Sequence, residues 1–305
     1  MDNDDANYLQ DKISEIRSLT KPKIKHLDIK GRLKPADEIA IAVVGSRKPT
    51  DYGIKACKFI VSGLAGAGVT IISGLMYGID IEAHKAALEA GGRTIAVLGY
   101  GMDYLPRHRY AKGIVDRVLK EDKGAIISQF EPQVPPDKWT FPNRNQLVAV
   151  LSKGVVVMEA AYRSGSLITA EFALEIGKNV FAVPGSIFAE TSKGKHQFIK
   201  EGAFLADHPD DILLSLGMKS ITQKGENSTA SKGLIANTLS DVAWASLSES
   251  EKSILKIMLK YTEELASEEI KSLTGIEVSA INVALTQLEL SGLVERTLSG
   301  KWHLG

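Results

Sequence analysis

Short apolar runs alternate with segments of helical periodicity along residues 39–217. The runs at 39–44, 70–73, 94–98, 125–127, 155–158, 179–183 and 203–205 are too short for helices and rich in β-branched residues, as expected of strands buried on both faces of a parallel sheet. Helical periods lie at 54–66, 80–89, 110–119, 143–152, 196–201 and 210–216, with another from about Leu167. This repeat predicts an α/β fold with a doubly wound, mostly parallel sheet.

The regions outside this repeat differ in character. Residues 1–38 hold one weakly amphipathic stretch and predict a short N-terminal arm, and residues 218–240 are polar without an apolar period, which predicts a flexible linker. Residues 241–305 predict three helices and a β-hairpin, the elements of a small C-terminal winged-helix domain. Acidic residues outnumber basic ones there, so we expect this domain to contact protein rather than DNA.

Ligands of doubly wound sheets bind at the carboxyl ends of the strands. Most of the loops predicted at these ends contain glycine, which lets the backbone approach a ligand closely. The turn at 163–166 directly precedes a helix, where free N–H groups and the helix dipole favour an anion such as phosphate. Arg144 and Lys153 flank the strand before this turn. A plain chain reversal is the alternative interpretation of such a turn.

The composition indicates the compartment of the protein but does not indicate its ligand. The 37 basic and 37 acidic residues cancel, so a nucleic-acid site would have to be a local patch. The single cysteine, Cys57, cannot form an intramolecular disulfide, which suits a reducing compartment. No stretch approaches the length of a membrane span, and the first residues are polar. We therefore expect a soluble cytoplasmic protein.

The sequence motifs of several enzyme classes are absent. No P-loop motif occurs, and the first strand is followed by GSRKPTDYG rather than a dinucleotide fingerprint. The histidines show no metal-ligand spacing, so we expect no catalysis, no metal and no cofactor. Loops that carry Arg or Lys beside the aromatic residues Tyr52, Tyr77, Phe141 and Tyr162 suit single-stranded nucleic acid. The alternative, aromatic residues in the core and solvated bases, stays open.

Five segments together resemble one family. They are AVVGSRKPTDYG, TIISGLMYGIDIEAHKAAL, GGRTIAVLGYGMD, the stretch from FPNRN to AVPG at 141–185, and KGKHQFIKEGA. In this order they resemble the DNA-processing protein A family (DprA, also called Smf) over about residues 39–217. The resemblance implies an extended Rossmann-like domain, a homodimer, sequence-independent binding of single-stranded DNA, and loading of the recombinase RecA onto DNA in natural transformation, without a catalytic reaction.

The same resemblance implies a set of DNA-binding residues. They are Gly45, Ser46, Arg47, Gly74, Tyr77, Phe141, Arg144, Lys153, Ser164, Gly165 and Ser166. In this set Arg and Lys side chains would meet phosphates, small-residue amides would hydrogen-bond phosphate oxygens, and Phe141 would offer a stacking face.

The chain departs from the family pattern at several positions. Met76 and Tyr77 stand where the family usually has Ala and Arg, and Asn143 and Gln146 stand where basic residues are common. Gln129 replaces the usual Glu after Ser128. The lost basic charges predict weaker and less salt-sensitive binding than in a typical member, and Tyr77 could compensate by stacking.

Two other functions use the same loops. The segment 164–171 distantly resembles the phosphate loop of lysine-decarboxylase-like nucleotide phosphoribohydrolases, in which Glu171 would act as acid or base and Arg144 would hold a phosphate. Glu171 is otherwise an ordinary acid in the early part of a helix. A nucleotide-sensing module is the third interpretation.

Overall fold

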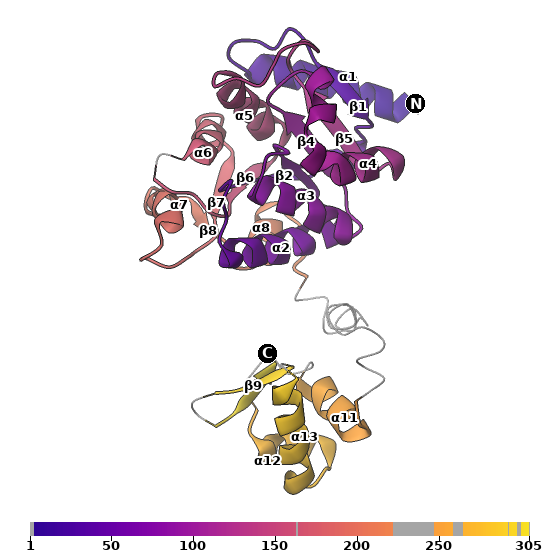
Figure 1. The fold of residues 1–305 in the computed structure, drawn as a ribbon, viewed down its shortest axis with the longest axis vertical. Coiled ribbons are helices and arrows are strands. Elements are labelled where there is room, and N and C mark those ends of the chain that lie inside the picture. The colour runs from indigo at the N-terminus through magenta and orange to yellow at the C-terminus, as the bar shows by residue number, and fades with distance from the viewer. Residues whose placement is uncertain are drawn as a thin grey trace. The chain divides into compact units, whose positions relative to one another are not determined.

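The computed structural model describes residues 3–162, 164–221, 247–258, 265–291, 293–297 and 300–304. They belong to two compact units, Met1–Ile221 and Thr222–Gly305, and each is described here by itself (Figure 1). No helix among these residues is long and apolar enough to cross a membrane.

The first unit is built on an eight-stranded sheet with the order β1-β5-β4-β3-β2-β6-β7-β8. Six neighbouring pairs are parallel, and β1 pairs with β5 in the antiparallel sense. The predicted doubly wound, mostly parallel α/β sheet is thereby confirmed. The strands are β1 (Asp28–Gly31), β2 (Ala40–Val44), β3 (Thr70–Ser73), β4 (Thr94–Leu98), β5 (Gly124–Ser128), β6 (Gly154–Val157), β7 (Asn179–Ala182) and β8 (Phe204–Leu205).

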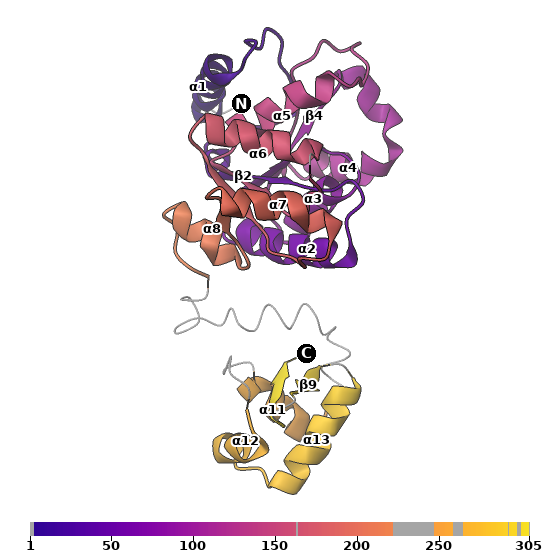
Figure 2. The same ribbon diagram turned by 90° about the vertical axis from the view of Figure 1, so that its left-hand side faces the viewer.

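Helices cover both faces of this sheet (Figure 2). Core residues of α1, α5 and α6 pack on one face, and those of α2, α3, α4 and α8 pack on the other. The bounds are α1 (Asn3–Leu19), α2 (Asp51–Gly66), α3 (Ile79–Glu89), α4 (Lys112–Lys120), α5 (Thr140–Leu151), α6 (Gly165–Glu175), α7 (Glu190–Lys200) and α8 (Pro209–Ser215), with 3-10 turns at Pro35–Glu38, Met102–Arg107 and Arg109–Ala111.

The central strands show why the sequence has continuous apolar runs. In β2, Ala42 and Val44 belong to one core while Ile41 and Val43 belong to the other. Side chains alternate between the two faces of a strand, so a strand that is covered on both faces needs apolar residues at every position.

The N-terminal residues are integrated into the first unit. Ile16 of α1 is buried in the core with α5, and β1 extends the sheet beside β5. Residues 218–221 of the predicted linker also pack on this unit, because the Ile221 N–H and the Ser220 hydroxyl both donate to the Asp210 carboxylate of α8 at 2.6 Å. The linker residues from 222 onward lie outside the described part of the chain.

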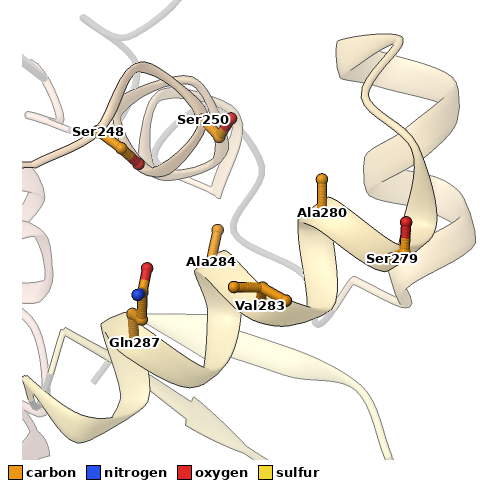
Figure 3. Close-up of a pocket in the computed structure, with 7 residues that line it drawn as sticks. All are labelled: Ser248, Ser250, Ser279, Ala280, Val283, Ala284 and Gln287. Carbon is orange, nitrogen blue, oxygen red and sulfur yellow. The ribbon is translucent and has the colours of Figure 1, made fainter.

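The second unit has its own core. Its helices are α11 (Glu249–Met258), α12 (Ser267–Thr274) and α13 (Val278–Leu290), followed by the antiparallel pair β9 (Val294–Arg296) and β10 (Trp302–Leu304). Ile254, Ile281, Leu285 and Trp302 pack together. A hollow of about 400 Å³ lies between the start of α11 and α13 and is lined by small or uncharged residues (Figure 3). Assignment of this unit to the winged-helix class stays a prediction.

Candidate functional site

The topology of the sheet singles out one crevice. From β2 the chain adds β3, β4 and β5 on one side, and it then returns to place β6 on the other side of β2. The loops after β2 and β6 therefore leave the sheet in opposite directions, and in doubly wound sheets ligands bind at such a switch point. We call this place, outside the carboxyl ends of β2 and β6, the crevice. These loops contain the predicted residues 45–47 and 164–166.

Helix α5 joins the loops around this crevice. The Arg47 guanidinium lies 5.1 Å from the centre of the Phe141 ring at the start of α5. One turn later, the Asn145 amide donates to the Gly165 carbonyl at 3.2 Å. The first two turns of α5 thus contact the loop after β2 and the first residue of α6. Residues 45–47, Gly74, Tyr77, Phe141 and residues 164–166 are called the loop cluster from here on.

The loop after β2 is held against α3 with its arginine exposed. The Ser46 carbonyl accepts from the Ile79 N–H at 3.1 Å, and the Ser46 hydroxyl accepts from the Lys48 N–H at 3.0 Å. Gly78 has φ +83°, and a side chain there would collide with the Ser46 and Arg47 backbone. This packing fixes the backbone of the loop, while the Arg47 side chain reaches solvent.

Tyr77 supplies an exposed ring on the next loop. It is 55% exposed and stacks on Tyr110 with the ring centres 3.9 Å apart. The Tyr110 hydroxyl donates to the Leu75 carbonyl at 3.2 Å, and burial raises its pKa to about 12, so it stays protonated. Position 77, where the family usually has an arginine, therefore carries an exposed aromatic ring that Tyr110 supports on one face.

Arg144 does not lie on this surface. It is 5% exposed, and its Nη1 donates to the Gly74 carbonyl at 2.5 Å and to the Val97 carbonyl at 2.6 Å. Gly74 has no room for a Cβ because the guanidinium occupies that space. The charge of Arg144 also opposes the rise that burial causes in the pKa of Asp80. The structure thus gives Arg144 a positioning role, in which it fastens α5 to β3 and β4.

The turn before α6 shows the geometry of a helix cap. The Ser166 N–H donates to the Ser164 hydroxyl at 3.4 Å, and the two hydroxyls lie 2.8 Å apart. Gly165 is exposed, and its Cβ position is open. The Leu167 N–H donates to the Ser164 carbonyl at 3.0 Å, so Ser164 itself satisfies two of the first amides of α6. Arg163, the remaining residue of the turn, lies outside the described part of the chain.

Lys153 is separated from the loop cluster. It immediately precedes β6, its N–H donates to the carbonyl of Ala40 at the start of β2, and its ammonium group pairs with Glu38. Both strands begin there, so Lys153 lies at the amino edge of the sheet, opposite the crevice. We therefore leave it out of the candidate site, because flanking a strand in sequence does not bring a residue to the strand's carboxyl end.

Two buried ionisable residues at the crevice escaped sequence analysis. Glu159 accepts hydrogen bonds from the Thr50 N–H at 2.9 Å and from the Thr50 hydroxyl at 2.6 Å. Lys195 of α7 donates to the carbonyls of Met158 and Pro184 at 2.9 and 3.2 Å, and burial lowers its pKa to about 8. Together they link the loops after β2, β6 and β7. The position of Glu159, directly after a buried strand, is the sequence feature that could have identified it as a residue of the crevice.

The described side chains offer no metal centre. No three His, Cys, Asp or Glu residues among them converge as ligands. His84 is buried, with Nδ1 2.7 Å from the Thr94 hydroxyl, and burial lowers its pKa to about 3. It is a neutral residue of the core.

The sequence model of the family described as DNA recombination-mediator protein A matches residues 5–217. The chain belongs to this family. Among its members, protein Smf of Escherichia coli (strain K12) is 46% identical over 204 residues, which are 66% of this chain and 54% of that protein. DNA processing protein DprA of Streptococcus pneumoniae (strain ATCC BAA-255 / R6) is 43% identical over 185 residues, 60% and 64% of the two chains. The chain thus spans only about half to two thirds of these relatives.

Solved structures of the family share the fold. DNA processing protein A from Streptococcus pneumoniae has a TM-score of 0.59 at 40% identity, with 67% of this chain and 69% of that chain covered. DNA processing protein A from Helicobacter pylori, whose structure concerns its single-stranded DNA binding mode, has a TM-score of 0.59 at 27% identity, with 66% and 91% covered. The resemblance to the DprA family found in the motifs is confirmed.

Proposed function

We propose that this chain binds single-stranded DNA, without preference for base sequence, through the loop cluster at the crevice between β2 and β6. The observation that carries the proposal is the exposed Arg47 held over the Phe141 ring. An arginine for phosphate beside a ring for stacking is the combination that single strands use, and neither group reads the hydrogen-bonding edge of a base. The relatives with DNA-processing names support the same activity.

An enzymatic site is less consistent with the contacts. That alternative places Arg144 on a phosphate near Glu171, yet the Arg144 guanidinium is buried against the Gly74 and Val97 carbonyls. Glu171 is an exposed residue inside α6. We therefore propose binding rather than catalysis as the activity of the crevice.

Fluorescence anisotropy of labelled oligo-dT and of the matching duplex, measured across a salt series, tests the proposal. We expect the single strand to bind more tightly. Arg47→Ala should lower its affinity by about tenfold or more, since a charge-assisted hydrogen bond contributes roughly 1.5–3 kcal/mol. It should also reduce the slope of log K against log salt by about 0.7, the value for one phosphate contact on a single strand.

Lys153→Ala is the matched control, because it removes one exposed cation from the opposite edge of the sheet. Its affinity and salt slope should equal those of the wild type. Unchanged binding in Arg47→Ala, or equal losses in the two variants, would reject the loop cluster as the DNA site.

We further propose that the bound strand is handed to a RecA-type recombinase during DNA uptake by natural transformation. The family's description as a recombination mediator supports this step. A strand-exchange reaction on DNA covered by single-strand-binding protein should be stimulated by the wild type and not by Arg47→Ala. Equal stimulation by both proteins would show that the step does not depend on the loop cluster.

The proposal also includes a homodimer formed through the β8 end of the sheet. Phe204 and Leu205 of this edge strand are 53% and 47% exposed. Exposed apolar side chains beside an open strand edge favour association. Light scattering should show a dimer for the wild type and a monomer for Phe204→Asp; a monomeric wild type would exclude it.

A further inference from the structure

A second pocket lies on the other flank of the start of α5. It has a volume of about 160 Å³ and is formed by residues 20–25, which connect α1 to β1, together with Gln129, Phe130, Trp139, Asn143 and Gln146. Three lysines, Lys21, Lys23 and Lys25, are among the lining residues, and no acidic residue is. In a chain with no net charge, this is a local concentration of positive charge.

The lysine segment is anchored while its ammonium groups stay exposed. The Lys21 N–H donates to the Gln146 side chain of α5 at 3.2 Å, and the Ile24 N–H donates to the buried Thr20 hydroxyl at 3.3 Å. Ile24 packs against the core of the first unit, whereas the lysines on either side of it are exposed. The backbone is thus fixed to α5 and presents a row of cations.

Trp139 supplies an aromatic surface in the same pocket. It is 53% exposed although it is a large apolar residue, and it meets the buried Phe130 in an edge contact with the ring centres 5.6 Å apart. An edge contact braces a ring and covers less of it than stacking would. Among the described residues none of the three lysines forms a salt bridge, and Asp28 and Glu131 lie close to His26 instead.

The pocket and the loop cluster share one rigid turn. Trp139 and Phe141 flank Thr140, whose buried hydroxyl donates to the Gly99 carbonyl at 2.6 Å. Phe141 lines the crevice side, against Gly99, and Trp139 lines the lysine side. The two rings are thus two residues apart on the chain, and the three lysines line the same pocket as Trp139.

We propose that this pocket is a second contact site for single-stranded DNA, in which a base stacks on Trp139 and the neighbouring phosphates meet Lys21, Lys23 and Lys25. The inference rests on the proposed function and extends it, because the bound strand continues from the crevice across the start of α5 toward α1. A row of cations along an extended segment suits a polynucleotide better than a single phosphate, which one or two of them would satisfy.

Oligonucleotide length separates the two sites. Anisotropy is measured on the full chain with an oligo-dT of about 5 nucleotides, which fills the crevice alone, and with one of about 20 nucleotides. The triple variant Lys21→Glu, Lys23→Glu, Lys25→Glu should bind the short strand like the control below and the long strand at least tenfold more weakly. Its salt slope on the long strand should fall by about 2, as expected for three lost phosphate contacts.

The matched control is Lys58→Glu, Lys120→Glu, Lys200→Glu, which changes the net charge equally at exposed positions of α2, α4 and α7. Arg47→Ala should weaken both lengths, so the two hypotheses fail differently. If the pocket variant matches the control on the long strand while Arg47→Ala loses affinity, the pocket is excluded and the crevice stands. If the wild type binds neither strand, both are rejected.

Trp139 also reports on its own contact. Trp139→Phe should keep the affinity for the long strand, Trp139→Ala should lose about fivefold to tenfold, in line with the stacking of one base, and both should keep the melting temperature of the wild type. DNA should quench tryptophan emission in the wild type, and this quenching should largely disappear in Trp139→Phe, which retains Trp244 and Trp302. Equal quenching in both proteins, or equal affinity in Trp139→Ala and the wild type, would overturn the proposal.

Discussion

Replacing Arg144 with alanine separates a positioning residue from a DNA contact. If Arg144 met a phosphate, its loss would weaken DNA binding and leave the fold intact. The structure instead has the guanidinium donating to the Gly74 and Val97 carbonyls and facing the Asp80 carboxylate. The main effect should therefore appear in the free energy of unfolding.

The size of this effect follows from the groups that lose a partner. Two buried carbonyls would each lose a charge-assisted hydrogen bond, at roughly 1.5–3 kcal/mol apiece, and Asp80 would lose its neighbouring cation. Removing one member of a buried charged arrangement typically costs about 3–5 kcal/mol. For a unit of this size we expect the melting temperature to fall by about 6 to 20 °C.

Differential scanning fluorimetry on three variants tests this reasoning. Arg144→Ala should show the large fall, and Arg109→Ala, at an exposed position of the same unit, should melt within about 2 °C of the wild type. Arg144→Lys keeps the charge and loses the two-carbonyl geometry of the guanidinium, so it should remain markedly destabilised. An unchanged melting temperature in Arg144→Ala, with a loss of DNA affinity as large as in Arg47→Ala, would refute the positioning role.

Two further substitutions probe the same frame. In Gly99→Ala the added Cβ would lie 2.7 Å from Phe141 Cδ1, so the ring must move. We expect a loss of about 1–3 kcal/mol in stability and weaker binding of single-stranded DNA. Gly113→Ala, whose Cβ would meet no neighbour, should bind normally, and equal binding by both variants would contradict the argument. Burial lowers the pKa of His84 to about 3. As the pH falls below about 6.5, this histidine is therefore protonated in the unfolded chain but stays neutral in the folded chain. The protonation of His84 should therefore lower the free energy of unfolding by about 2.5 kcal/mol between pH 7 and pH 4.5. His84→Asn should show a correspondingly flatter pH dependence in urea unfolding. Parallel pH profiles of the two proteins would refute this role of His84.

The fold was predictable because the pattern of the strands is redundant. The central parallel strands are covered on both faces, so runs such as 40–44 and 155–158 are apolar at every position and are followed by glycine-containing loops. The helix over 190–200 was harder: only its last part, 196–201, shows an apolar period. Its first turns contain Ser192 and Gly194, which are poor helix formers. Gly194 is needed there because a Cβ would lie 2.8 and 2.6 Å from the Ala160 and Ala161 carbonyl oxygens.

The candidate site was predictable in its loops and less so in its charges. Arg47 and Tyr77 are exposed at the ends of β2 and β3, where the strand–loop–helix pattern placed them. Arg144 and Lys153 were grouped with them as cations, and a sequence cannot distinguish an arginine that faces solvent from one that is enclosed by two carbonyls. The burial of Lys195 was not predicted. A lysine in a polar helical segment gives no sign that its ammonium group will be buried and will donate to two carbonyl oxygens.

On the proposed function, these contacts explain how the site would bind single-stranded DNA without base specificity. The buried charged side chains of Arg144, Lys195 and Glu159 form hydrogen bonds with carbonyl, hydroxyl and amide groups of the protein itself. These bonds hold the loops in place before any ligand binds. Arg47, Phe141 and Tyr77 then present one cation and two rings on a rigid frame, so binding need not order the backbone, and this lowers the entropic cost. A phosphate and the face of a base are common to all nucleotides. On the proposed function, an aromatic residue in place of a basic one at position 77 would exchange a salt-sensitive contact for a stacking contact, and binding would remain independent of sequence.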